Sequence, residues 1–158
     1  MLSDLIIGLL LTVLPIVELR GGLPFIVKYC NDIGVSVLPY FALVVFLNSL
    51  VALFVFIFLD YGHNYFLKWS FYRRHMNKYL ERVRMKAIPM QIKMQAWGFV
   101  ALAIFVAIPL PGTGAWTGSV LAWILNLNKT KSIIAITIGV LFSGLFILSV
   151  SLGFFSLL

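Results

Sequence analysis

Charge is scarce in this sequence of 158 residues, of which 11% are charged and 62% are hydrophobic. A soluble domain of this length cannot bury so much apolar surface in one core. The composition therefore excludes an ordinary soluble protein. It indicates a single integral membrane domain over residues 1–158, with lipid as much of its solvent.

Residues that carry catalysis or bind metals are scarce as well. Cys30 is the one cysteine, which excludes an intramolecular disulfide and a cysteine-rich metal site. No Ser/His/Asp set, metal-ligand spacing or phosphate-binding glycine loop occurs. We therefore expect neither an enzyme nor a cofactor or metal. The net charge of +7 is concentrated between Asp60 and Ala96, among Tyr, Trp and Met residues, which argues against a nucleic-acid partner.

Two apolar runs are long enough to cross a membrane. Val37–Leu59 and Ile133–Leu157 would each span the hydrocarbon core, about 30 Å thick, as a helix. Two other apolar runs, Leu5–Leu14 and Phe99–Ile108, would reach only about halfway. Each meets a Pro/Gly-rich segment that breaks a helix, and a second short apolar arm follows. This pattern predicts two re-entrant helical hairpins with irregular tips at membrane depth.

The same order of elements occurs twice, as a hairpin plus a span in residues 1–59 and again in 97–158. Residues 60–96 join them, and their apolar residues recur at helical spacing with Lys and Arg between them, which predicts a basic amphipathic helix at the membrane surface. Because each repeat crosses the membrane once, the second must be inverted relative to the first. The positive-inside rule then predicts a multi-pass cell-membrane protein with a cytoplasmic connector and external termini.

The predicted hairpin tips contain the candidate substrate-binding residues. Two charges at membrane depth, Glu18 and Arg20, are costly and suggest a function. Arg20 offers a donor fork for an anion such as phosphate, and Glu18 can carry a coupling proton. Glycines at the tips allow positive φ and would expose the N-terminal amides of the following half-helices. The further candidates are Gly21, Gly22, Asn48, Ser49, Gly112, Thr113, Gly114, Trp116 and Thr117.

The two tip segments also carry a family resemblance. Pro15-Ile-Val-Glu-Leu-Arg-Gly-Gly-Leu-Pro24 and Pro109-Leu-Pro-Gly-Thr-Gly-Ala-Trp-Thr-Gly118 resemble the signature segments of the small multi-drug export protein family. That family is similar, more distantly, to the DedA superfamily, whose members have opposed re-entrant hairpins and are implicated in lipid translocation. The resemblance implies a transporter or lipid translocase. The second tip departs from the DedA pattern because it carries no charge.

Three functional hypotheses follow. The first is translocation of an anionic amphiphile, such as polyprenyl phosphate or another lipid phosphate, with membrane lipids as partners and either passive or coupled to a proton carried by Glu18. The second is efflux of small molecules, cationic compounds among them, as in multidrug export, and the third is a non-transporting membrane scaffold. Two spans and two hairpins are few elements to enclose a transport pathway, so we also expect a homo-oligomer.

Overall fold

The computed structural model describes residues 2–62 and 98–156, together with Arg74, Lys78, Glu81, Arg82 and Met85. The described residues form helices, turns and loops, with no β-strand among them. The predicted all-α class is therefore confirmed for this part of the chain. Most of the predicted amphipathic connector, within 60–96, lies outside the described residues.

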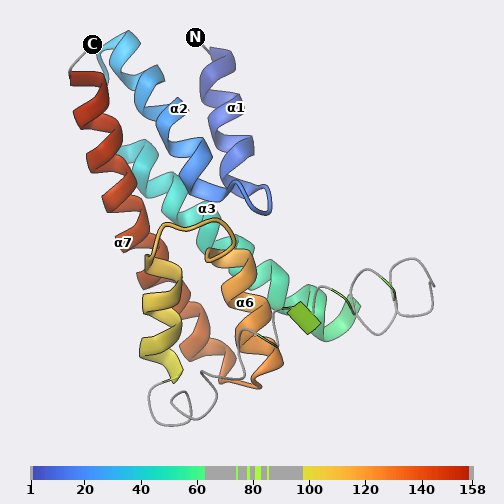
Figure 1. Ribbon diagram of the computed structural model, residues 1–158. Coiled ribbons are helices and arrows are strands. Elements are labelled where there is room, and N and C mark those ends of the chain that lie inside the picture. Colours follow the sequence, from blue (N-terminus) through green and yellow to red (C-terminus); the bar gives the residue numbers. More distant parts are fainter. Residues whose placement is uncertain are drawn as a thin grey trace.

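The described helices form two short pairs and two long elements (Figure 1). One pair leads inward from the end of the molecule that holds the start and finish of the chain, and the other leads inward from the opposite end. The tips of the two pairs face each other near the middle. In chain order the helices are α1 (Leu2–Val13), α2 (Glu18–Ile33), α3 (Leu38–Ile57), the π-helical turn η1 (Phe58–Gly62), an unlabelled helix (Gly98–Ala107), α6 (Ala115–Ile124) and α7 (Lys129–Ser156).

The long elements agree with the two predicted spans. Leu38–Gly62 and Lys129–Phe154 are both long and apolar enough to cross a membrane. α7 begins earlier than the predicted Ile133, because the Asn128 side chain accepts a hydrogen bond from the backbone N–H of Lys131 at 3.1 Å and caps the helix. Large apolar side chains on both elements remain exposed, including Phe46 at 58% and Phe142 at 59%. Such outer faces are suited to lipid rather than water.

Small residues bring the short helices close to their neighbours. A Cβ atom added to Gly22 in α2 would lie 2.3 Å from Cγ2 of Thr12 and 2.4 Å from the carbonyl oxygen of Gly8, both in α1. In the second pair, Gly118 of α6 lies against Val106 in the same way. The pairs then pack crosswise, with α2 against α7 and α6 against α3. Close backbone approach of this kind is how helices associate within lipid.

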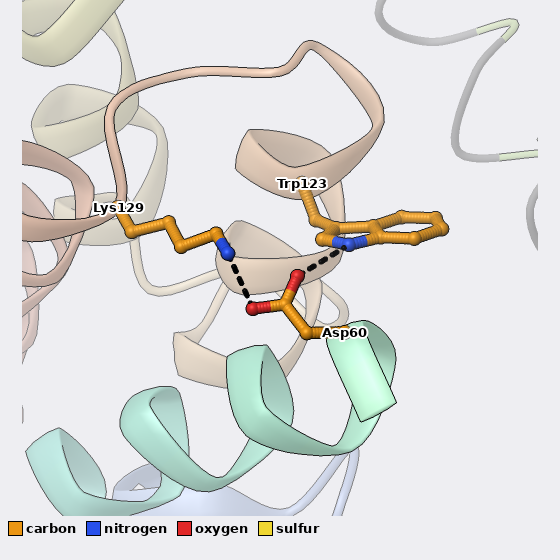
Figure 2. A network of polar contacts seen from close by, with 3 residues as sticks. All are labelled: Asp60, Trp123 and Lys129. Carbon is orange, nitrogen blue, oxygen red and sulfur yellow. Dashed lines mark hydrogen bonds and ion pairs between the residues drawn. The ribbon is translucent and has the colours of Figure 1, made fainter. Parts of the chain in front are cut away.

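A polar network holds the base of the second pair against the end of α3 (Figure 2). Asp60, in η1, accepts a hydrogen bond from the indole N–H of Trp123 at 3.2 Å. Its other carboxylate oxygen lies 2.5 Å from Nζ of Lys129 at the start of α7. One carboxylate therefore joins η1, α6 and α7. The ion pair is partly exposed, so we expect it to contribute at most about 1 kcal/mol to stability.

Replacing Gly22 by valine tests the close contact between α1 and α2. The added side chain would overlap Thr12 and the backbone of Gly8, so we expect the free energy of unfolding to fall by about 2 kcal/mol. Unfolding of the purified protein in detergent micelles would measure the change. Gly153→Ala is the matched control, because a Cβ atom there meets nothing within 4 Å. An unfolding curve of Gly22→Val equal to that of the control would contradict the described packing.

Candidate functional site

The first tip is shorter than the sequence predicts. α1 ends at Val13 and α2 already begins at Glu18, so Gly21 and Gly22 lie within α2 rather than before it. Neither has a positive φ, and Gly22 is needed for close packing on α1 instead. The prediction that these two glycines free the backbone ahead of a half-helix was therefore wrong. The left-handed backbone of this tip lies instead at Ile16, with φ 78°, and at Glu18, with φ 50°, ahead of both glycines.

The second tip follows the sequence prediction more closely. Pro109 and Pro111 separate the helix Gly98–Ala107 from α6, and Gly112 has a φ of 80°, in the region that favours glycine. Gly114 is the N-cap residue of α6 and has extended backbone angles. A glycine at the N-cap has no side chain that can bond the first free amides of the helix. α6 therefore needs a cap from elsewhere.

Glu18 supplies that cap from the first tip. Oε1 of Glu18 accepts a hydrogen bond from the backbone N–H of Trp116 at 3.0 Å, and the N–H of Ala115 faces the same carboxylate. These are the first two residues of α6, where free amides and the helix dipole both favour a negative charge. Glu18 is 3% exposed, so this interaction takes place away from solvent. The amides that we expected to be exposed at the start of this half-helix thus bind a carboxylate of the protein itself.

Gly114 makes room for this carboxylate. A Cβ atom at position 114 would lie 1.3 Å from Oε2 of Glu18 and 2.2 Å from its Cδ. These distances are far below van der Waals contact, so glycine is the residue that permits the carboxylate to approach α6. The requirement for Gly114 arises from this close approach and not from its φ, which is −89°.

Arg20 binds the opposite side of the same break. Its Nη2 donates to the carbonyl oxygen of Ile108 at 3.3 Å and to the hydroxyl oxygen of Thr113 at 2.9 Å, while its Nη1 donates to the carbonyl oxygen of Leu110. The first of these carbonyls follows directly on the helix Gly98–Ala107, whose C-terminal end favours a cation. Thr113 also donates its hydroxyl proton to these carbonyls, with oxygen–oxygen distances of 2.6 and 2.8 Å. Arg20 and Thr113 therefore satisfy the free end of that helix together.

Trp116 returns a hydrogen bond to the first tip. Its indole N–H donates to the carbonyl oxygen of Val13, the last residue of α1, at 3.0 Å. Its ring packs edge to face on Phe54 of α3, with centroids 6.5 Å apart. These two residues, with Val13, help to line an open apolar groove of about 330 Å³ between α3 and the tips. Trp116 of the second tip thus donates a hydrogen bond to the end of α1, and Arg20 of the first tip donates one to the end of the helix Gly98–Ala107.

The candidates on α3 bond to their own helix. Nδ2 of Asn48 donates to the carbonyl oxygen of Val44 at 3.0 Å, and the Ser49 hydroxyl donates to that of Val45 at 2.9 Å. Asn48 is fully buried, and its Oδ1 has no partner among the described residues. The buried hydroxyl of Ser143 in α7 also lacks one, and we did not select it from the sequence although it lies in the middle of a span. Thr117 is half-buried in α6.

The comparisons with known proteins give one family. The family model described as Putative small multi-drug export protein matches residues 18–146. That range begins at Glu18 and includes both charged residues of the first tip and all of the second tip. Neither the curated proteins nor the solved structures give a match. Together with the two long apolar helices, the family match makes this chain a membrane protein.

Gly114→Ala tests the contact between the tips. Because the added methyl group would occupy the position of the Glu18 carboxylate, we expect the cap to be expelled and the free energy of unfolding to fall by about 2–3 kcal/mol. Thermal unfolding in detergent would measure the loss, with Gly153→Ala as the control. The loss should shrink when Glu18 is also replaced by alanine, since the clash then disappears. Additive losses for the two substitutions would refute the described contact.

Proposed function

Because the chain belongs to the small multi-drug export protein family, we propose that it exports small amphipathic compounds across the cell membrane. The proposed pathway passes the point where the two tips meet. The observation that carries the proposal is a buried carboxylate, Glu18, bonded to a residue that lines an apolar groove. Trp116 joins the two features, because its backbone N–H binds Glu18 and its ring lines the groove.

In the proposed topology α3 and α7 cross the membrane and the two short helix pairs are re-entrant hairpins. The pairs lead inward from opposite ends, as two inverted repeats would (Figure 1). Irregular backbone at membrane depth is tolerated only where its polar groups find partners, and the bonds made by Arg20 and Trp116 provide them. Lys129 and Lys131 lie at the end of the molecule that leads into the basic connector, so this end is cytoplasmic in the proposal. The same arrangement is what the resemblance to the DedA superfamily implies.

The contacts support a cationic or hydrogen-bond-donating substrate better than an anionic one. Both terminal nitrogens of Arg20 already bind protein oxygens, and Glu18 occupies the first amides of α6. An anionic lipid headgroup would have to displace these bonds. A cation has no such bonds to displace at Oε2 of Glu18, a buried acceptor without a partner among the described residues, although Nε of Arg20 is a buried donor that likewise lacks one. The family description also fits small-molecule export better than translocation of a lipid phosphate.

Dye release from proteoliposomes tests the proposal. Vesicles containing the protein are loaded with ethidium, a small aromatic cation, and its release is followed with and without an imposed pH gradient. We expect faster release than from empty vesicles, and a fall to the rate of empty vesicles for Glu18→Gln. A labelled polyprenyl phosphate in the same vesicles provides the comparison with the anionic-lipid hypothesis. Translocation of the lipid without release of the dye would overturn the choice of substrate.

A double variant separates a transport role of Glu18 from its structural role. Aspartate at position 114 can bond the free amides of α6 locally, because Gly114 has the extended backbone that N-cap residues adopt. In Glu18→Ala/Gly114→Asp the helix is therefore capped, while the carboxylate of the first tip is gone. We expect thermal stability near that of the wild type but no dye release. Recovery of dye release together with stability would show that Glu18 serves only to hold the tips together.

A further inference from the structure

Glu18 and Arg20 each keep one buried polar atom without a partner. In the part of the chain that the structure describes, Oε2 of Glu18 and Nε of Arg20 are both buried and make no hydrogen bond. Buried groups of this kind are rare in folded proteins because their lost hydration is not replaced. The two atoms are complementary, since a carboxylate oxygen accepts and the Nε–H of a guanidinium donates. They also belong to residues only two positions apart in the same tip.

The backbone of the first tip is held in an unfavourable conformation at the same place. Glu18 has a φ of 50° and Ile16 a φ of 78°, in the left-handed region that non-glycine residues seldom adopt. Such conformations persist only where surrounding contacts enforce them, and they are frequent in parts of proteins that switch. Two contacts hold Glu18 here: its backbone N–H donates to the carbonyl oxygen of Leu14 at 3.0 Å, and its carboxylate accepts from the N–H of Trp116 at 3.0 Å.

We propose that Glu18 and Arg20 exchange partners when the two tips separate. With the tips together, Glu18 binds the start of α6 and Arg20 binds the carbonyls of Ile108 and Leu110. With the tips apart, the backbone of Glu18 relaxes to an extended conformation, and Oε2 accepts a hydrogen bond from Nε of Arg20. This inference rests on the proposed function, because it describes how the export pathway opens.

The exchange removes the main obstacle to opening such a pathway within lipid. Separation of the tips without it would leave an unpaired carboxylate and an unpaired guanidinium in apolar surroundings, which is strongly unfavourable. Residues at i and i+2 of a regular helix point in different directions. Glu18, however, is the first residue of α2 and can leave the helix without disturbing the turns that follow. The paired state therefore requires a change at one end of one helix only.

Gly114→Asp is the variant that tests the exchange. The aspartate caps α6 itself, and its Cβ occupies the space of the Glu18 carboxylate, so Glu18 is displaced while α6 stays capped. The probe is the Nε–H resonance of Arg20 in the protein labelled with ¹⁵N-arginine and reconstituted in nanodiscs, assigned by its loss in Arg20→Lys. We expect this resonance to move downfield in Gly114→Asp, as a hydrogen bond to a carboxylate forms. The shift should disappear when Glu18→Gln is added.

The result that overturns the proposal is an Nε–H resonance that is the same in Gly114→Asp with and without Glu18→Gln. A wild-type resonance that is already shifted and depends on Glu18 overturns it as well, because the pair would then exist with the tips together. Gly114→Ala provides a second displacing variant if the aspartate itself binds Arg20. None of these measurements depends on transport, so failure of the proposed export function in dye-release assays remains distinguishable from failure of the exchange.

Discussion

The described structure depends on how the backbone groups at the break between the helix Gly98–Ala107 and α6 find partners. The first helix ends there with free carbonyl groups, which carry partial negative charge, and α6 begins with free N–H groups, which carry partial positive charge. Glu18 binds the positive end, at the N–H of Trp116, and Arg20 binds the negative end, at the carbonyl of Ile108. Both side chains come from the first turn of one helix. The positions of Glu18 and Arg20 in that turn therefore set the relative orientation in which the two tips meet.

This arrangement explains why the second tip carries no charged residue. The second tip contributes to the electrostatic interaction through its backbone N–H and carbonyl groups, which carry partial charges and are held in place by the helices. A carboxylate at position 114 would repel Glu18, and any side chain there would collide with it. The uncharged Gly-Thr-Gly sequence is thus the complement of the charged first tip.

The sequence predicted the elements well and their contacts poorly. The two spans follow from apolar length alone, because a run such as Val37–Leu59 has few other stable conformations in lipid. Glu18 and Arg20 were recognisable because charge within apolar sequence is costly. Their partners were not, because a backbone amide or carbonyl has no signature in the sequence, and which of them is free depends on where helices end. Gly22 and Gly114 illustrate the same limit, since the sequence shows a glycine but not whether φ or close approach requires it.

The role of Glu18 as a helix cap and its proposed role in export place opposing requirements on this residue, which favours a site that moves over a rigid one. As a cap it uses one oxygen, and the other remains buried without a partner although a second donor would stabilise it. A purely structural carboxylate would be expected to have both oxygens satisfied, as native proteins nearly always achieve. The left-handed backbone of Glu18 adds a further unfavourable contribution to the same residue. An interaction that is strong at one carboxylate oxygen and absent at the other holds the tips together without making their separation prohibitive, which is what the proposed export through this point requires.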